Sequence, residues 1–255
     1  MGADAKPSAP GRRNVRLVIE YDGTDFSGWQ RQPRRRTVQQ CLEIAIARVT
    51  SQKVKLISAG RTDAGVHAEG QVANFRTSSV LEPARLVAGI NANLDPDVAV
   101  LSAVDVPHGF HANREAKGKV YRYTISTRKV RPVFDRRFVH WSRRRLDLAA
   151  MRAAAAHLVG RHDFDSFRAE GCVEKNTVRT VGDITFEENG DLIRIYFSGD
   201  GFLYMMIRIM VGTLIEVGRG RLSPGDIPGI IDARDRAAAG PTARPEGLCL
   251  VEVKY

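Results

Sequence analysis

Cysteine is scarce in this chain of 255 residues. The three cysteines, Cys41, Cys172 and Cys249, lie far apart, and an odd number cannot form a complete set of disulfide bonds. No Cys and His residues show the spacing of a zinc site. The sequence therefore predicts a cytoplasmic protein with reduced thiols and no bound metal.

Long apolar segments are also missing. No segment reaches the roughly twenty apolar residues of a membrane-spanning helix, and the most apolar one, residues 202–217, is interrupted by Arg208. Residues 1–13 are polar and contain Pro7 and Pro10, which predicts a disordered tail and no apolar signal segment. These absences argue against a membrane partner.

Acidic residues are outnumbered, because 29 Asp and Glu residues face 39 Lys and Arg residues, for a net charge of +10. Such an excess is typical of proteins that bind phosphates, in nucleic acid or on an anionic membrane. With 43% hydrophobic residues, the chain is long enough to form one large domain or two of moderate size.

Hydrophobic periodicity predicts the order βαββαβ for the first half of the chain. Thr37 and Gln40 are typical of a capping box at the start of a helix whose apolar residues run from Val38 to Val49. Pro83 indicates the first turn of a second helix. The expected strands cover residues 14–22, 53–58, 71–77 and 98–106.

The second half repeats this order with negligible sequence identity between the halves. Asp147 is expected to cap a helix that ends at Gly160, Asn189-Gly190 predicts a hairpin, and an apolar helix is expected over 203–217. Further strands are expected at 120–127 and 248–253. We therefore predict an α/β fold of two lobes, residues 14–109 and 110–255, whose mostly antiparallel sheets join across a central basic cleft.

One loop carries the strongest chemical signal. In Gly60-Arg61-Thr62-Asp63-Ala64-Gly65-Val66-His67-Ala68, a single carboxylate lies between two glycines and is followed by a histidine. Gly and Asp are favoured in turns, so Asp63 alone is compatible with a purely structural turn. His67 either contacts a nucleic acid or only stabilises the loop.

Arg208 is the only charged residue in an otherwise apolar helix. A guanidinium is almost never buried without an anion, so a carboxylate or phosphate is expected beside it. A structural ion pair, or an arginine that extends to the surface, explains it equally well. If Asp63 is the partner, the pair spans the cleft and keeps the carboxylate ionised, as a nucleophile or a base requires.

Other residues are suited to contact RNA. Tyr121 and Tyr123 share one face of a strand, where Tyr121 can stack on an unstacked base; packing in the core is the alternative for Tyr121 and is favoured for Tyr123. Arginine runs are usually solvated, but the net charge favours phosphate contacts for the run before the first helix. Its members include Arg31, Arg34, Arg35 and Arg36.

Taken together, these motifs resemble the TruA family of tRNA pseudouridine synthases. The matching segments are Tyr21-Asp22-Gly23-Thr24, Gly28-Trp29-Gln30, Gly60 to Ala68, Phe110-His111-Ala112, Tyr121-Arg122-Tyr123, His162-Asp163-Phe164, Phe202-Leu203, Met206-Ile207-Arg208, Gly247-Leu248 and Tyr255. They run nearly from end to end and in order. Ile209 and Asn113 depart from the family pattern, which puts secondary RNA contacts in doubt.

The resemblance implies a pseudouridine synthase fold and an isomerase that converts uridine to pseudouridine around positions 38 to 40, in the anticodon arm of tRNA. It implies a homodimer that uses no cofactor and no metal. By the same resemblance, Asp63 is the essential aspartate, Arg208 its basic partner, Tyr121 the tyrosine that stacks on the target base, and Arg61 the arginine that displaces and holds the nucleotide. The sequence leaves open whether Asp63 attacks the sugar, attacks the base or removes a sugar proton.

Two alternatives have different chemistry. A non-catalytic RNA-binding module also uses sheet aromatics, but it gives no reason for Arg208 in an apolar helix. A metal-dependent nuclease needs clustered carboxylates, which are sparse around Asp63.

Overall fold

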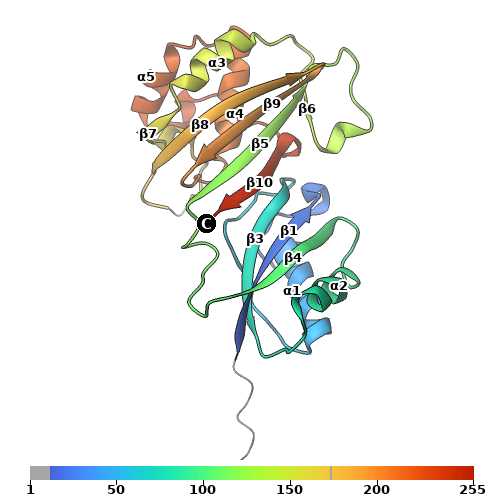
Figure 1. The fold of residues 1–255 in the computed structure, drawn as a ribbon. Helices are drawn as coiled ribbons and strands as arrows, with labels where there is room; N and C mark the ends of the chain where they lie inside the picture. The colour runs from blue at the N-terminus through green and yellow to red at the C-terminus, as the bar shows by residue number, and fades with distance from the viewer. Residues whose placement is uncertain (1–11, 173) are drawn as a thin grey trace, which may run out of the picture.

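The computed structural model describes residues 12–172 and 174–255 and shows a mixed α/β fold (Figure 1). The predicted tail, residues 1–13, lies outside the described residues except for its last two. Of these, Arg13 is already the first residue of strand β1, Arg13–Tyr21.

The first half of the chain follows the predicted βαββαβ order. Alternating burial along β1 places Val15, Leu17 and Ile19 in the core, as expected for a half-buried strand. Helix α2 begins at Pro83, as predicted. The remaining elements are α1 (Val38–Thr50), β2 (Ile57–Ser58), β3 (His67–Thr77), α2 (Pro83–Asn91) and β4 (Val98–Val106).

The second half keeps the predicted order and adds two short strands and a helix to it. Asp147 caps α3 by accepting a hydrogen bond from the Ala150 backbone, and the hairpin turns at Gly190, whose φ is 58°. The elements are β5 (Gly118–Ser126), β6 (His140–Trp141), α3 (Leu148–Ala156), β7 (Gly160–Asp163), β8 (Val178–Asn189), β9 (Leu192–Gly199), α4 (Met206–Gly218), α5 (Asp226–Ala233) and β10 (Leu248–Lys254).

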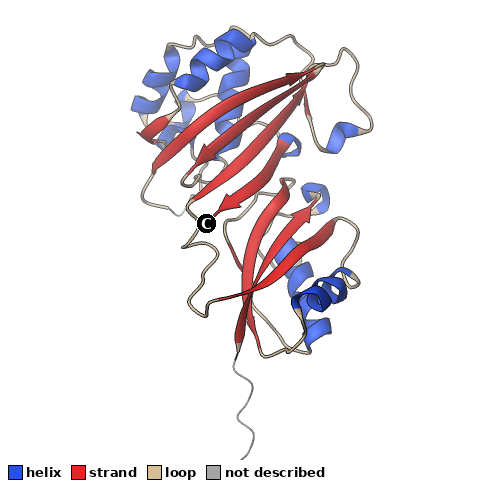
Figure 2. Ribbon diagram, viewed as in Figure 1, coloured by secondary structure: helices blue, strands red, loops and turns tan. Residues whose placement is uncertain are grey.

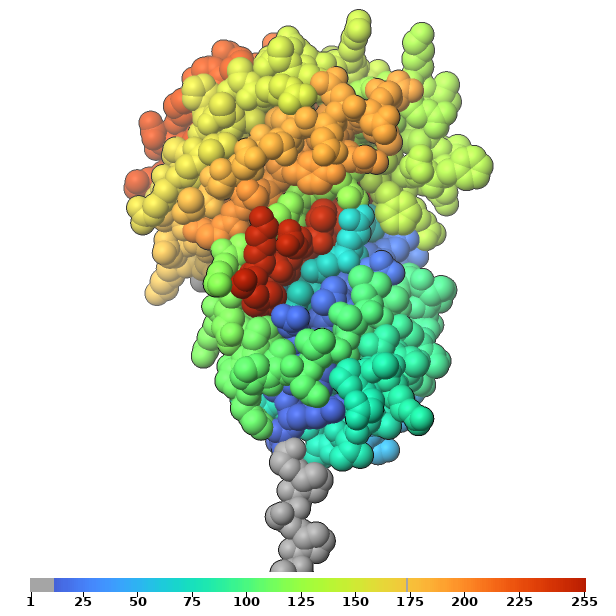
Figure 3. All heavy atoms as spheres, viewed as in Figure 1, coloured from blue at the N-terminus to red at the C-terminus, as the bar shows by residue number. Residues whose placement is uncertain are grey.

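The strands of both halves form one sheet with the order β4-β1-β3-β10-β5-β9-β8-β7. Strand β10 pairs antiparallel with β5 and parallel with β3, where Cys249 lies opposite His67. Figure 3 shows β10 (red) across the middle of one face, between the two halves of the chain. The predicted division after residue 109 falls in the connection between β4 and β5, and it stays a prediction.

Helices α1 and α2 accompany the first half of the sheet, and α3, α4 and α5 accompany the second half (Figure 2). Within residues 12–172 and 174–255, no helix is both long and apolar enough to cross a lipid bilayer. The core extends through both halves, and among its largest fully buried side chains are Trp29, Phe75, Phe164 and Phe197.

Four local predictions were wrong in detail. The strand expected over residues 53–58 covers only Ile57–Ser58. Thr37 is the N-cap residue of α1, but its side chain makes no capping hydrogen bond, so the capping box is absent. Helix α3 ends at Ala156, before Gly160, which has a φ of 114° and begins β7. Helix α4 begins at Met206, because Met205 adopts the left-handed conformation with φ 58°.

Candidate active site

A cleft of about 1100 Å³ opens between the two halves of the molecule. Its lining includes residues on both sides of the connection between β4 and β5, from Ser27 to Leu248. Five of the described lining residues are Lys or Arg and two are Asp or Glu: Arg35, Lys55, Arg61, Lys119 and Arg208, against Asp63 and Glu174. The cleft is therefore basic, as the net charge of the chain suggested.

Asp63 enters this cleft from the loop between β2 and β3. The backbone N–H of Val66 donates to the Asp63 carbonyl at 3.2 Å, which closes a β-turn with Gly65 at its third position. Gly65 has a φ of 77°, a value that favours glycine. The Trp29 N–H donates to the Thr62 carbonyl at 3.1 Å, so the loop is also held by a segment of the first half.

Arg208 meets Asp63 from the opposite half of the molecule. It lies in the first turn of α4, and its Nη1 donates to Asp63 Oδ2 at 3.2 Å. The two side chains are 12% and 16% exposed. Arg208 Nε also donates to the Ala243 carbonyl at 2.8 Å, which fixes the plane of the guanidinium. The pair expected from the sequence is present, and it spans the cleft.

The electrostatics of Asp63 differ from the sequence-based expectation. Burial raises the pKa of its carboxyl group, and the charge and hydrogen bond of Arg208 offset only part of that rise. The ionised form is thus less favoured than in water, because only one side chain donates a hydrogen bond to it among the described residues. A poorly solvated carboxylate of this kind is a stronger base and a stronger nucleophile than an exposed one.

Tyr121 forms part of the cleft wall beside this pair. It is 7% exposed and packs edge-on against Phe202, with ring centroids 5.4 Å apart. Tyr123, two residues later, is fully buried and donates from its hydroxyl to the Arg244 carbonyl at 2.9 Å. The structure thus places Tyr121 at the cleft and Tyr123 in the core.

The structure separates the predicted arginines. Arg61 and Arg35 line the cleft. Arg31 does not, and its guanidinium lies 3.4 Å from Glu43. Arg34 is exposed outside the cleft lining, with a φ of 58°.

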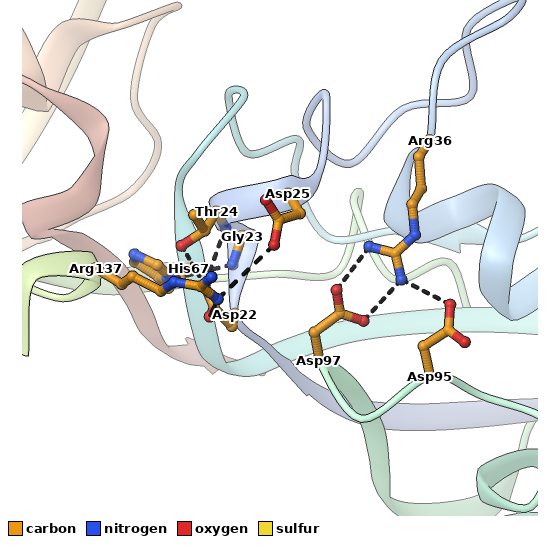
Figure 4. A network of polar contacts seen from close by, with 9 residues as sticks. All are labelled: Asp22, Gly23, Thr24, Asp25, Arg36, His67, Asp95, Asp97 and Arg137. Carbon is orange, nitrogen blue, oxygen red and sulfur yellow. Dashed lines mark hydrogen bonds and ion pairs between the residues drawn. The ribbon is translucent and has the colours of Figure 1, made fainter. Parts of the chain in front are cut away.

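His67 does not reach the cleft. It lines a smaller hollow of about 280 Å³ formed by other residues. Burial lowers the pKa of His67, and its Nδ1 accepts a hydrogen bond from the Gly23 backbone at 3.0 Å. Figure 4 shows it beside Asp22 and Arg137, in a polar network distinct from the Asp63–Arg208 pair. This matches the alternative in which His67 stabilises its own loop.

Comparison with known proteins adds independent information. A family model described as tRNA pseudouridine synthase matches residues 17–113 and 154–255. A tRNA pseudouridine synthase A of Geotalea uraniireducens is 47% identical over 243 residues, which is 95% of this chain and 100% of that protein. With the same coverage, a tRNA pseudouridine synthase A of Acetivibrio thermocellus is 46% identical and a tRNA pseudouridine synthase A 2 of Clostridium perfringens is 44% identical.

The chain belongs to the tRNA pseudouridine synthase family. Enzymes of this family are isomerases, because uridine and pseudouridine contain the same atoms. The matched ranges include Asp63, Tyr121 lies between them, and Arg208 falls in the second range.

Several cleft residues of this synthase were not singled out from the sequence. Lys119 lines the cleft two residues before Tyr121, and strand alternation at that spacing would have placed both on one face. Phe202, the neighbour of Tyr121, was named only within the Phe202-Leu203 segment that resembles the TruA family, and no local pattern predicted that it lines the cleft. Asn113, one of the two departures from the family pattern, also lines the cleft, whereas Ile209 is fully buried and unavailable to RNA.

No group of three or more His, Cys, Asp or Glu side chains suited to a metal ion occurs in the described part of this synthase. The expectation that it uses neither metal nor cofactor stays a prediction.

Proposed function

We propose that this chain converts uridine to pseudouridine at positions 38 to 40 in the anticodon arm of cytoplasmic tRNAs, as a homodimer and without a cofactor. The observation that carries the proposal is the Asp63–Arg208 contact of 3.2 Å, inside a basic cleft. A module that only binds RNA needs positive charge and stacking rings, but it has no use for a poorly solvated carboxylate at the centre of its binding surface.

The reaction suits a site with so few chemical groups. The bond from N1 of the base to C1′ of the sugar breaks, and a bond from C5 to C1′ forms. The hydrogen on C5 leaves as a proton, and N1 gains one, so nothing is oxidised or reduced. Asp63 acts as the nucleophile toward the sugar or the base, or as the base that removes a sugar proton. Each of these roles requires the ionised carboxylate.

The remaining cleft residues supply binding and positioning. The cleft volume of about 1100 Å³ slightly exceeds that of ordinary ligand pockets, which span roughly 300–1,000 Å³, and suits a nucleotide turned out of its helix. Unstacking that nucleotide costs a few kcal/mol, and stacking on Tyr121 returns about 1–3 kcal/mol. Arg61, exposed at the cleft, holds the displaced nucleotide, and Arg35 contacts its phosphate backbone.

The test is pseudouridine mapping of unmodified tRNA incubated with the purified protein. We expect new pseudouridine only within positions 38 to 40 and none with the Asp63→Asn variant. Binding of tRNA without any pseudouridine from the intact protein would contradict the proposal and favour a binding module. Light scattering on the same sample measures the mass of the assembly, and a monomer at the working concentration would contradict the homodimer.

A further inference from the structure

Lys119 is a cleft residue to which the proposed reaction assigns no role. It lies in β5 two residues before Tyr121, so both side chains leave the same face of the strand, with Cα atoms roughly 7 Å apart. Both line the cleft. Burial lowers the pKa of the Lys119 ammonium, and the nearby charge of Arg179 acts in the same direction.

This ammonium has no carboxylate partner among residues 12–172 and 174–255: none of the ion pairs or side-chain hydrogen bonds there involves it. Glu174 is the acidic group whose charge acts on it, but the Glu174 carboxylate lies 2.7 Å from Arg179. A partly buried cation without an anion is unfavourable, because lost hydration is not replaced. Such an arrangement is typical of a site that is completed by a ligand.

The Lys119 ammonium lies directly against Gly60. A Cβ atom added to Gly60 would lie 2.8 Å from Lys119 Nζ, so the glycine leaves the room that the ammonium occupies. Gly60 lies three residues before Asp63, in the same loop. The ammonium therefore lies between the loop that carries the carboxylate and the strand that carries the stacking ring.

We propose that Lys119 binds a backbone phosphate directly next to the target uridine and so holds that nucleotide in the cleft that contains Asp63. The inference rests on the proposed function, because it needs an RNA in the cleft. A phosphodiester is the ligand that fits: it supplies the missing negative charge, and a lysine ammonium can give it three hydrogen bonds. Lys119 is in this view a positioning residue, and it takes no part in bond making or breaking.

The experiment combines a charge removed from the protein with a charge removed from the RNA. Full-length tRNAs carry one neutral methylphosphonate at each phosphate around the target in turn. Binding is measured with each variant combined with Asp63→Asn, so that no turnover occurs. Single-turnover rates are measured with the same variants in protein that retains Asp63. The variants are Lys119→Met, Lys119→Arg and Gly60→Ala, with Lys55→Met as the matched control, since Lys55 is an exposed lysine of the same cleft.

We expect Lys119→Met to weaken binding about tenfold and to change the saturating rate less than threefold. The slope of log affinity against log salt should fall in magnitude by about 0.7 to 0.9, and Lys119→Arg should restore most of the affinity. One methylphosphonate next to the target should lower the tRNA affinity of the protein with Lys119 about tenfold. The same methylphosphonate should not lower the affinity of Lys119→Met any further. In Lys55→Met, every methylphosphonate should lower the tRNA affinity by the same factor as it does in the protein with Lys55.

Gly60→Ala moves the ammonium without removing it, because the new methyl group meets only the flexible end of Lys119. Gly60 has no left-handed φ, so alanine fits its backbone. We expect about a threefold loss of affinity in the presence of Lys119 and none in Lys119→Met. The inference would be overturned if each methylphosphonate lowered the affinity equally with and without Lys119. It would also be overturned if Lys119→Met lowered only the saturating rate. The proposed function fails separately, if the intact protein makes no pseudouridine.

Discussion

Asp22 and Asp63 are two carboxylates of nearly equal exposure, 20% and 16%, and their pKa values shift in opposite directions. At Asp63, burial raises the pKa and Arg208 alone opposes it. At Asp22, burial also acts to raise the pKa, but it is outweighed by two hydrogen bonds from Thr24 and by the charges of His67 and Arg137, so the pKa falls. Figure 4 shows these groups around Asp22.

The difference shows that the solvent exposure of a side chain alone does not identify a reactive carboxylate. Asp22 has enough donors to be stable as an anion, and Arg36 similarly satisfies Asp95 and Asp97 at 2.6–2.8 Å. Asp63 has fewer donors than its degree of burial requires. The shortage of donors, combined with an open cleft, is what makes Asp63 suited to chemistry and Asp22 suited to stability.

The largest expected effect is that of Asp63→Asn. Removing the Asp63 carboxylate, which the proposed reaction requires, should lower the single-turnover rate by about 10⁴-fold or more, while tRNA affinity stays within a few-fold. The measurement is pseudouridine formation at saturating enzyme. Asp22→Asn is the matched control, with an expected rate within threefold of the unaltered protein. Equal losses in the two variants would remove the distinction between the carboxylates.

The next effect tests the single partner of Asp63. Arg208→Gln should lower the rate by about 10²–10³-fold, because a preorganised charge is lost and the pKa of Asp63 rises further. Activity requires the ionised carboxylate, so it falls as pH falls through the pKa of Asp63, and this acidic limb should move to higher pH in the variant. The pH profile of the single-turnover rate checks this, and an unmoved limb would show that Arg208 does not set that pKa.

Tyr121 and Tyr123 extend the comparison to aromatic residues of one strand. Tyr121→Leu should weaken the reaction by about 10–100-fold, since stacking on a base contributes about 1–3 kcal/mol. Tyr123→Phe removes only the hydrogen bond to the Arg244 carbonyl and should cost about 1 kcal/mol of stability with little change in rate. Rates and thermal unfolding of both variants are compared, and a larger loss of rate in Tyr123→Phe would reverse the assignment.

The smallest effect concerns the stability that Asp22 contributes. Because its pKa is lower in the folded protein than its ordinary value of 3.8, the contribution is present above that value and is lost as pH falls through the lower folded value. Asp22→Asn should therefore cost about 1 kcal/mol near neutral pH, a shift of about 2–4 °C in Tm, and nothing in strong acid. A difference in Tm that persists in strong acid would contradict the assignment of the lowered pKa to Asp22.

Local sequence patterns were sufficient for most of the elements. Alternation marked β1, Pro83 marked the start of α2, and Asn189-Gly190 marked the hairpin, because each signal acts over a few residues of backbone. The capping box was predicted wrongly. Thr37 has a suitable residue type and lies at the N-cap position, but whether its side chain bonds to the backbone there depends on neighbours that the local sequence does not specify.

The sequence by itself determined the turn that carries Asp63, the charge of the cleft residues and the need of Arg208 for an anion. Only the tertiary structure decided that β10 joins the two halves, which brings residues 145 positions apart within 3.2 Å. The tertiary structure also decided the direction of the Asp63 pKa shift. It placed His67 in the smaller hollow and Lys119 in the cleft. Turn geometry follows from neighbouring residues, whereas desolvation and long-range pairing depend on every element that packs around a group.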